Sequence, residues 1–195
     1  MSTTPPASTD ARPYHHGDLP RALLDAAIEA ILEVGPAAVS LRDLARRTGV
    51  SHAAPAHHFG DKAGLLTALA TDGFRRLAAT LREAHQATGS FLEVGVAYVR
   101  FAVTHRAHFE VMFRPELYHT DDPDLVQARD AARALLYPPA AEAANSSDGA
   151  GEWRAAVAAW SLVHGLATLW LNHNLPPQLG DDPEQITREV AHYLF

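Results

Sequence analysis

Residues 49–62, GVSHAAPAHHFGDK, hold three of the chain's twelve histidines and are the densest set of side chains that could do chemistry. Imidazole rings can bind a metal, act as general bases, or donate hydrogen bonds to phosphate and base atoms of a nucleic acid. The same stretch contains a helix-breaking glycine, a serine able to cap a helix, and an aspartate able to start a second one. The surrounding elements must decide among these three uses.

Metal binding and acid–base catalysis lack a supporting pattern. His105 and His108 stand three residues apart, but no third ligand and no H-E-x-x-H spacing accompanies them. A helical hydrolase or lyase would use one of these or His164 as its general base, together with a partner carboxylate and a positioned nucleophile. Glu110 is near in sequence, but no motif frames it, and the chain has no cysteine. We therefore expect no metal and no cofactor, and an enzyme is the less favoured alternative.

Almost the whole chain has the three- and four-residue apolar spacing of α-helices, and strand-like alternation is absent. Glycine, proline and acidic turns divide the chain into about nine helices. We predict them at residues 17–34, 40–48, 51–59, 61–87, 91–106, 107–113, 122–137, 151–173 and 182–194. The expected fold is all-α, with three short helices, a long connecting helix and then a helical bundle.

Two of the short helices, joined by a tight turn at Gly49, indicate a helix-turn-helix, whose second helix fits the major groove of DNA. We expect Ser51 to cap this second helix, whose first turn offers free backbone N–H groups to a phosphate. Three small alanines in the same helix let the backbone approach DNA closely. Pro55 removes an early helical hydrogen bond, so we expect the helix to begin irregularly.

The charge distribution permits a nucleic-acid partner although the net charge is −7. Residues 1–83 contain nine Lys+Arg and nine Asp+Glu, whereas residues 84–195 contain seven and fourteen, so the whole deficit (7 − 14 = −7) lies in the second part. Attraction to phosphate depends on local placement, so the first part can present a basic face. No secretory signal and no apolar run of roughly 18 residues is visible. We expect a cytoplasmic protein without membrane contact.

Residues 23–66 resemble the DNA-binding domain of the TetR/AcrR family of transcriptional regulators. The similar motifs occur in family order: LLDAA at 23–27, Gly35, SLRDLA at 40–45, GVS at 49–51, HF at 58–59, Lys62 and Leu65. Farther on, AWSLVHGLATL at 159–169 resembles the tryptophan–histidine–glycine signature of one C-terminal subgroup. YHHGDL at 14–19 and HRAHFEVMF at 105–113 are similar to the same subgroup.

Carried over position by position, the resemblance implies two kinds of DNA contact. Phosphate contacts come from Ser40, Ser51, His58 and Lys62, and base-edge or groove contacts come from Arg42, His52, Ala53 and His57. The family usually has an aromatic residue, most often tyrosine, where this chain has Ala56. This departure supports a second alternative, a helix-turn-helix protein whose DNA binding is weakened or vestigial.

The resemblance also implies a homodimeric regulator, most often a repressor, that binds a palindromic operator in double-stranded DNA and responds to a small-molecule effector. Because one helix-turn-helix reads only a half-site, tight and specific binding requires two copies. We expect a disordered arm at 1–13, the DNA-binding domain at 14–77, and the effector-binding and dimerisation domain at 78–195.

An aromatic-rich set of side chains at helical spacing is the candidate effector pocket, although a filled core explains it equally well. The aromatic set is Tyr98, Phe101, Phe109, Met112, Phe113, Trp160 and Trp170, and the polar groups would come from Tyr98, His105 and His164. The residues assigned to the pocket are Tyr98, Phe101, His105, Phe109, Met112, Trp160 and His164. An effector bound among them is expected to be apolar or aromatic. His164 is interpreted either as an imidazole hydrogen-bonded to a neighbouring helix or as a polar group facing the cavity. Gly165 is interpreted as a place where another helix comes close.

The last two predicted helices are the candidate dimer interface, because residues 152–174 are apolar on more than one face. Pairing this segment and residues 183–194 with their symmetry mates gives a four-helix interface. The expected interface residues are Leu162, Leu166, Leu169, Trp170, Val190 and Tyr193. The long helix at 61–87 joins the two parts of the chain, so its tilt is expected to transmit effector binding to the DNA-binding unit.

Overall fold

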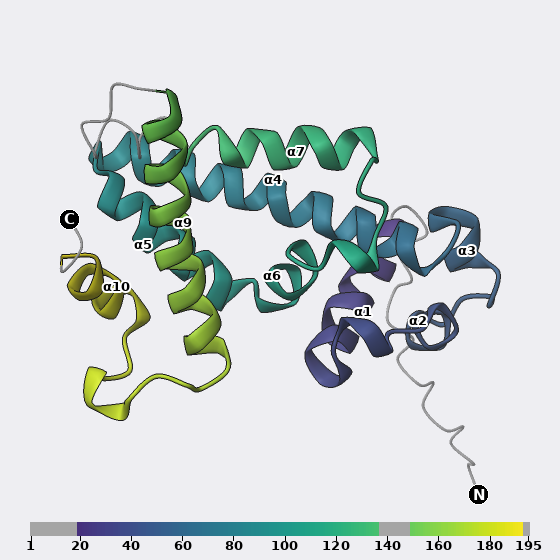
Figure 1. Ribbon diagram of the computed structural model, residues 1–195. Coiled ribbons are helices and arrows are strands. Elements are labelled where there is room, and N and C mark those ends of the chain that lie inside the picture. Colours follow the sequence, from purple (N-terminus) through teal and green to yellow (C-terminus); the bar gives the residue numbers. More distant parts are fainter. Residues whose placement is uncertain (1–18, 137–148, 193–195) are drawn as a thin grey trace, which may run out of the picture.

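A computed structural model describes residues 19–136 and 149–192, and every regular element within these ranges is helical (Figure 1). The α-helices are α1 (Leu19–Val34), α2 (Leu41–Thr48), α3 (Ala54–Phe59), α4 (Lys62–Thr88), α5 (Phe91–Thr104), α6 (Arg106–Met112), α7 (Pro123–Arg133), α9 (Gly149–Leu171) and α10 (Pro183–His192). The all-α prediction is confirmed. The arm predicted at 1–13 lies outside the described residues.

Helices α1, α2 and α3 gather around the start of α4 at one end of the molecule (Figure 1). The inner face of α1 buries Leu23, Ala27 and Ile31, which follow one another at steps of four residues. This spacing puts all three side chains on one side of the helix, where α2 and α3 pack. The three short elements therefore form a compact unit on the start of α4.

Two predicted boundaries of this unit are confirmed. Gly49 ends α2 with φ 70°, a left-handed conformation that glycine adopts without steric cost, and its N–H points to the carbonyls of Ala45 and Arg46. Asp61 starts α4, because its carboxylate accepts a hydrogen bond from the Gly64 N–H at 2.8 Å.

The start of α3 differs from the prediction. The helix begins at Ala54 with Ala53 at the N-cap position and no side-chain cap, so Ser51 is not the capping residue. The Ala54 N–H reaches the Ser51 carbonyl at 3.0 Å, which closes a turn before the helix. Pro55 is buried in the first turn of α3, where its missing N–H interrupts no helical hydrogen bond. The helix therefore starts three residues later than predicted, after a separate turn, and the proline costs it no hydrogen bond.

Helix α4 contacts α5, α6 and α7, and helices α9 and α10 pack on α5 and on each other. One continuous core runs from Leu23 in α1 to Ile186 in α10, so the boundary predicted between residues 77 and 78 falls inside α4 and inside this core. A Cβ on Gly73 of α4 would lie 2.6 Å from the sulfur of Met112, which shows how closely α4 and α6 approach. Helices α9 and α10 lie at the opposite end from α2 and α3 (Figure 1).

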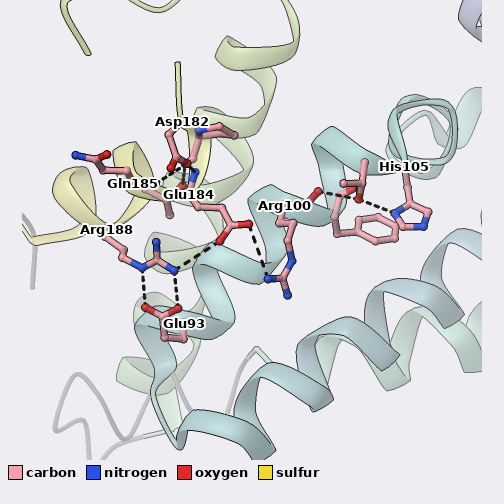
Figure 2. Close-up of polar contacts among 11 residues, drawn as sticks. Glu93, Arg100, His105, Asp182, Glu184, Gln185 and Arg188 are labelled. Atoms are coloured by element: carbon pink, nitrogen blue, oxygen red, sulfur yellow. Dashed lines mark hydrogen bonds and ion pairs between the residues drawn. The ribbon is translucent and has the colours of Figure 1, made fainter. Parts of the chain in front are cut away.

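Ion pairs fix α10 to α5 (Figure 2). Arg188 donates to both carboxylate oxygens of Glu93, at 2.8 and 2.9 Å, and this pairing lowers the pKa of Glu93. Glu184 lies 3.6 Å from Arg188 and 3.8 Å from Arg100. Asp182 starts the helix by accepting from the N–H groups of Glu184 and of the residue after it, at 2.9 and 3.1 Å. The C-terminal helix is thus oriented by several partly exposed polar contacts.

None of the described helices is both long enough and apolar enough to cross a membrane.

Candidate functional site

Most of the predicted DNA-contacting side chains lie on the open surface of α2, α3 and the turns before them. The exposed ones are Ser40, Arg42, Ser51, His52, Ala53, His57 and His58. Pro55 is buried and Phe59 packs partly into the core, so α3 rests on its neighbours through these two residues. Ala54 is half-buried, and Ala56, His57 and His58 face solvent.

Both predicted phosphate-binding serines keep hydroxyl groups that are free of capping bonds. Ser40 lies in extended backbone directly before α2 and makes no side-chain cap. Ser51 contributes its carbonyl, not its hydroxyl, to the turn before α3. Lys62 differs, because its ammonium group already donates to the carbonyl oxygen of Ala37. The serine hydroxyls can donate to a phosphate directly, whereas Lys62 would have to share or exchange its partner.

The three arginines of α2 have different surroundings. Arg47 donates to both oxygens of Glu33, at 2.9 and 2.6 Å, and to Asp43 at 2.6 Å, which joins α2 to α1 and lowers the pKa of both carboxyl groups. Arg46 also pairs with Asp43, at 2.6 Å. Arg42 is exposed and forms no ion pair with any described residue. Of these three guanidinium groups, that of Arg42 is the one free to reach DNA.

A cavity of about 270 Å³ lies between α4, α5, α6, α7 and α9. Tyr98, Met112 and Trp160 line it, as the sequence predicts. The lining residues outside the predicted pocket set are Phe74, Leu77, Phe113, Pro115, Tyr118, Arg129, Ala132, Arg133 and Leu136, of which Phe113 belongs to the predicted aromatic set. Several of these come from α7 and the residues after it, where the sequence carries only an amphipathic pattern and no motif. That pattern does offer one indication of a polar group in the wall, because Arg129 stands directly beside the buried apolar residues of α7.

Of the other four predicted pocket residues, Phe101 and Phe109 belong to the packed core, and His105 and His164 are half-buried beside them. Phe101 is buried and stacks on His105, with ring centroids 4.8 Å apart and planes at 13°. Phe109 is buried and packs against His164, with ring centroids 5.2 Å apart. None of the four lines the cavity of about 270 Å³. The aromatic set is therefore partly pocket and partly filled core.

A chain of hydrogen bonds holds the cavity wall in place. The Trp160 indole N–H donates to the Tyr98 hydroxyl at 3.2 Å, and this hydroxyl lies 2.9 Å from Nδ1 of His164. The hydroxyl can donate its own proton to Nδ1, and His164 is then a neutral imidazole with its proton on Nε2. Burial raises the pKa of Tyr98 and lowers that of His164, so both stay uncharged at neutral pH. His164 thus has a hydrogen-bond partner on the neighbouring helix α5.

A second polar cluster, which the sequence analysis missed, joins α4 to α6. His108 is buried and its Nε2 lies 3.1 Å from the carboxylate of Asp72, which also accepts from Arg76 at 2.6 Å. The hydrogen bond from His108, and then that from Arg76, hold the pKa of Asp72 well below its usual range. Within residues 19–136 and 149–192, no three potential metal ligands come together.

Comparison with known proteins identifies the family. A family model described as "Bacterial regulatory proteins, tetR family" matches residues 23–69, which contain α2, α3 and most of α1. A second, described as "Tetracyclin repressor-like, C-terminal domain", matches residues 91–194, more than half of the chain. The chain belongs to the TetR family of bacterial regulatory proteins. Membership of the tryptophan–histidine–glycine subgroup stays a prediction.

Individual relatives of this TetR-family chain agree with that assignment. An HTH-type transcriptional repressor from Mycobacterium tuberculosis is 38% identical over 69 residues, which are 35% of this chain and 37% of that protein. A protein of unknown function from Rhodococcus sp. RHA1 is 35% identical, covers 94% of this chain and 96% of its own, and has a TM-score of 0.75. The regulator FadR from Bacillus subtilis, solved in complex with stearoyl-CoA, is 14% identical over 89% of this chain and 96% of its own, with a TM-score of 0.65, and shows the fold alone.

The predicted dimer residues of this TetR-family chain are placed differently from one another. Leu169 is 44% exposed, whereas Leu162, Trp170 and Val190 are half-buried. Leu166 is buried in the chain's own core and is removed from the candidate interface for that reason. Tyr193 lies outside the described residues.

The close approach of another helix expected at Gly165 is not made by any helix of the described chain. A Cβ placed there would meet nothing within 4 Å, so no helix of the same chain comes close. The reason is the rotation of α9, which turns Gly165 toward the outer side, in line with Val157, Ser161 and Leu169 at steps of four residues. Val157 and Leu169 are 48% and 44% exposed. The helix therefore carries a partly apolar outer stripe.

Proposed function

We propose that this protein is a DNA-binding transcriptional repressor that binds a palindromic operator as a homodimer in the cytoplasm and is released by a small-molecule effector. The observation that carries the proposal is the exposure of Arg42 and of the start of α3 around the buried Pro55. A helix that enters the major groove must present its first turn to solvent, with small residues where the groove is close. Ala53 and Ala56 are small and exposed there, and the exposed His52 and His57 stand beside them.

The proposed contacts follow from the exposed groups. Ser40, Ser51 and His58 would donate to phosphates and fix the register on the duplex, while Arg42 and His57 would reach base edges. Arg47 would act indirectly, because its pairing with α1 fixes the orientation of α2 before DNA arrives. Family membership and the curated repressor relative support this assignment.

We propose the outer stripe of α9, together with Val190 of α10, as the dimer interface. Water is a poor partner for Val157 and Leu169, and a second copy of α9 would cover them. Gly165 lies in the middle of the stripe with open space above it, which would let the two helices come close. Such an arrangement places one helix-turn-helix on each side of a two-fold axis.

The cavity is the proposed effector site, and α4 is the element through which it would act. Tyr118 lines the cavity, and the next residue, His119, donates its backbone N–H to the Thr67 hydroxyl of α4 at 3.0 Å. The His119 ring also lies 3.6 Å from Asp61, which starts α4 beside α3. An effector that displaces Tyr118 would pull on this end of α4 and change DNA affinity by about 1–3 kcal/mol. The proposed DNA-binding and effector parts, residues 14–77 and 78–195, share this helix.

Electrophoretic mobility shifts with genomic fragments test the function. We expect one or a few fragments to bind at low protein concentration, with an affinity that falls steeply as salt rises, because phosphate contacts release counterions. If every fragment binds equally weakly, the alternative supported by Ala56, a helix-turn-helix with vestigial DNA binding, is the better account.

A further inference from the structure

The proposed effector cavity has one wall group whose charge is not matched. Arg129 of α7 lines the cavity, and its Nε is buried without a hydrogen-bond partner. Its guanidinium also forms no ion pair with any carboxylate in the described part of the chain. The neighbouring Arg133 differs, because it lies 3.6 Å from Asp130 and is half exposed.

The other polar groups on the wall already have partners. The Tyr118 hydroxyl donates to the Met112 carbonyl at 2.7 Å, and the Tyr98 hydroxyl is engaged with Trp160 and His164. Among the described residues, no acidic side chain lines the cavity. Arg129 is therefore a hydrogen-bond donor facing a space whose remaining wall is largely aromatic and aliphatic.

A buried donor without an acceptor is unfavourable, and a guanidinium group is more costly than a neutral one. Such a group persists where a ligand completes it, and the guanidinium fork matches the two oxygens of a carboxylate. The rings of Phe74, Phe113 and Trp160 would meanwhile cover the apolar part of the same molecule.

We propose that the effector of this protein is an organic anion, an apolar body with a carboxylate or a similar acidic group that pairs with Arg129. The inference rests on the proposed function, since it takes the cavity to be the effector site. It adds the chemical class of the effector and the residue that recognises its charge. A neutral apolar molecule of the same shape would fill the cavity but leave Arg129 without its partner.

Calorimetric titration with matched pairs of probes tests the proposal. The pairs are 1-naphthaleneacetate with 1-naphthaleneacetamide, and decanoate with decanamide. The proteins are the full wild-type chain, Arg129→Gln, and Arg82→Gln as a control on the exposed side of α4, away from the cavity. We expect the wild type and the control to bind each carboxylate roughly ten- to a hundredfold more tightly than the matching amide. Arg129→Gln should bind both members of the pair equally.

Equal binding of acid and amide by the wild type overturns the proposal, and so does an unchanged preference in Arg129→Gln. Failure of all four probes to bind also counts against it. A second measurement needs no probe. If the Nε of Arg129 lacks a partner, Arg129→Met should raise the melting temperature of the ligand-free protein by about 2–4 °C, because an unmet donor is removed from the cavity wall. A lower melting temperature would show that Arg129 is already satisfied, which contradicts the proposal.

Gel shifts of the same proteins separate this inference from the proposed function. If the wild type shows no preference for the acids but binds operator DNA specifically when ligand-free, the anion proposal alone is refuted. If the wild type prefers the acids, this preference depends on Arg129, and no DNA fragment binds specifically, then the repressor proposal is refuted and the anion site is retained.

Discussion

At the scale of single residues, the proposed DNA-reading surface relies on neutral donors and small side chains. His52 and His57 can donate hydrogen bonds without adding a fixed charge, and Ala53 and Ala56 leave room for the sugar–phosphate backbone. The fixed positive charge without a partner comes from Arg42, since Arg46 and Arg47 pair with carboxylates and Lys62 donates to a backbone carbonyl. Such a surface gains its affinity from several modest contacts, so one added donor should be measurable.

Ala56→Tyr supplies the aromatic side chain that resembles the family pattern. Ala56 is exposed on α3, so the ring has space and its hydroxyl can reach a phosphate. We expect operator binding to strengthen by about 1 kcal/mol, one hydrogen bond's worth. Titrations at several salt concentrations measure the change, with Ala87→Tyr at the exposed far end of α4 as the control. Equal affinities of Ala56→Tyr and the wild type would show that the ring is not missed.

The neutral His164 makes stability depend on pH. Burial lowers its folded-state pKa below the ordinary value of 6.5, so the unfolded chain binds more protons just below that value. The contribution of neutral His164 to the free energy of unfolding should therefore be fully present above about pH 6.5, and it should be lost as the pH falls below that value. Denaturant titrations at about pH 7.5 and about pH 5.5 measure this loss, because carboxyl groups are mostly ionised at both values. The decrease in the free energy of unfolding between these two pH values should be smaller for His164→Gln than for the wild type. The exposed control His52→Gln should behave as the wild type does, and an unaltered slope in His164→Gln would contradict this account.

At the scale of the elements, the corner between α3 and α4 depends on a glycine. A Cβ on Gly64 would lie 1.9 Å from the carbonyl oxygen of Phe59, the last residue of α3. Backbone atoms cannot move aside as a flexible side chain can, so any side chain at this position must push α3 away from α4. The position of the proposed recognition helix is thus fixed by close backbone contact as well as by side chains.

Gly64→Ala should therefore lower the free energy of unfolding by about 1–3 kcal/mol and weaken DNA binding at the same time. Gln86→Ala is the control, because Gln86 is exposed near the far end of α4, away from α3. Denaturant titration and operator binding measure both effects. Gly64→Ala with wild-type stability and affinity would show that α3 has another way to adjust.

At the scale of the whole molecule, the helices and turns can be predicted from the sequence, whereas most of the cavity wall cannot. Periodicity and the residues at Gly49 and Asp61 predict helices and turns because these signals are local. The cavity wall depends on how α7 and α9 are rotated against the bundle, which no local sequence pattern specifies. For this reason the sequence does not predict that Arg129 lines the cavity, and it leaves two interpretations of His164 open. Pro55 was misjudged because its effect depends on where the helix begins.

The assembly proposed for the whole molecule is tested by Leu169→Glu. Leu169 is 44% exposed on the outer stripe of α9, and a charge there would be buried between two copies at a high cost. Sedimentation velocity should show a dimer for the wild type and monomers for this variant. Leu32→Glu, at a 56% exposed leucine of α1, is the control and should remain dimeric. A monomeric wild type would exclude the proposed homodimer.

The proposed function depends most on α3 entering the major groove of DNA, and the affinity of Ala53→Glu for operator DNA tests this directly. Fluorescence anisotropy with a labelled operator fragment would compare the wild type, Ala53→Glu and the control Ala87→Glu. A carboxylate at the exposed start of α3 would face phosphates, so we expect its affinity to fall on the order of a hundredfold while the control binds as the wild type does. Wild-type affinity in Ala53→Glu would show that this surface does not contact DNA.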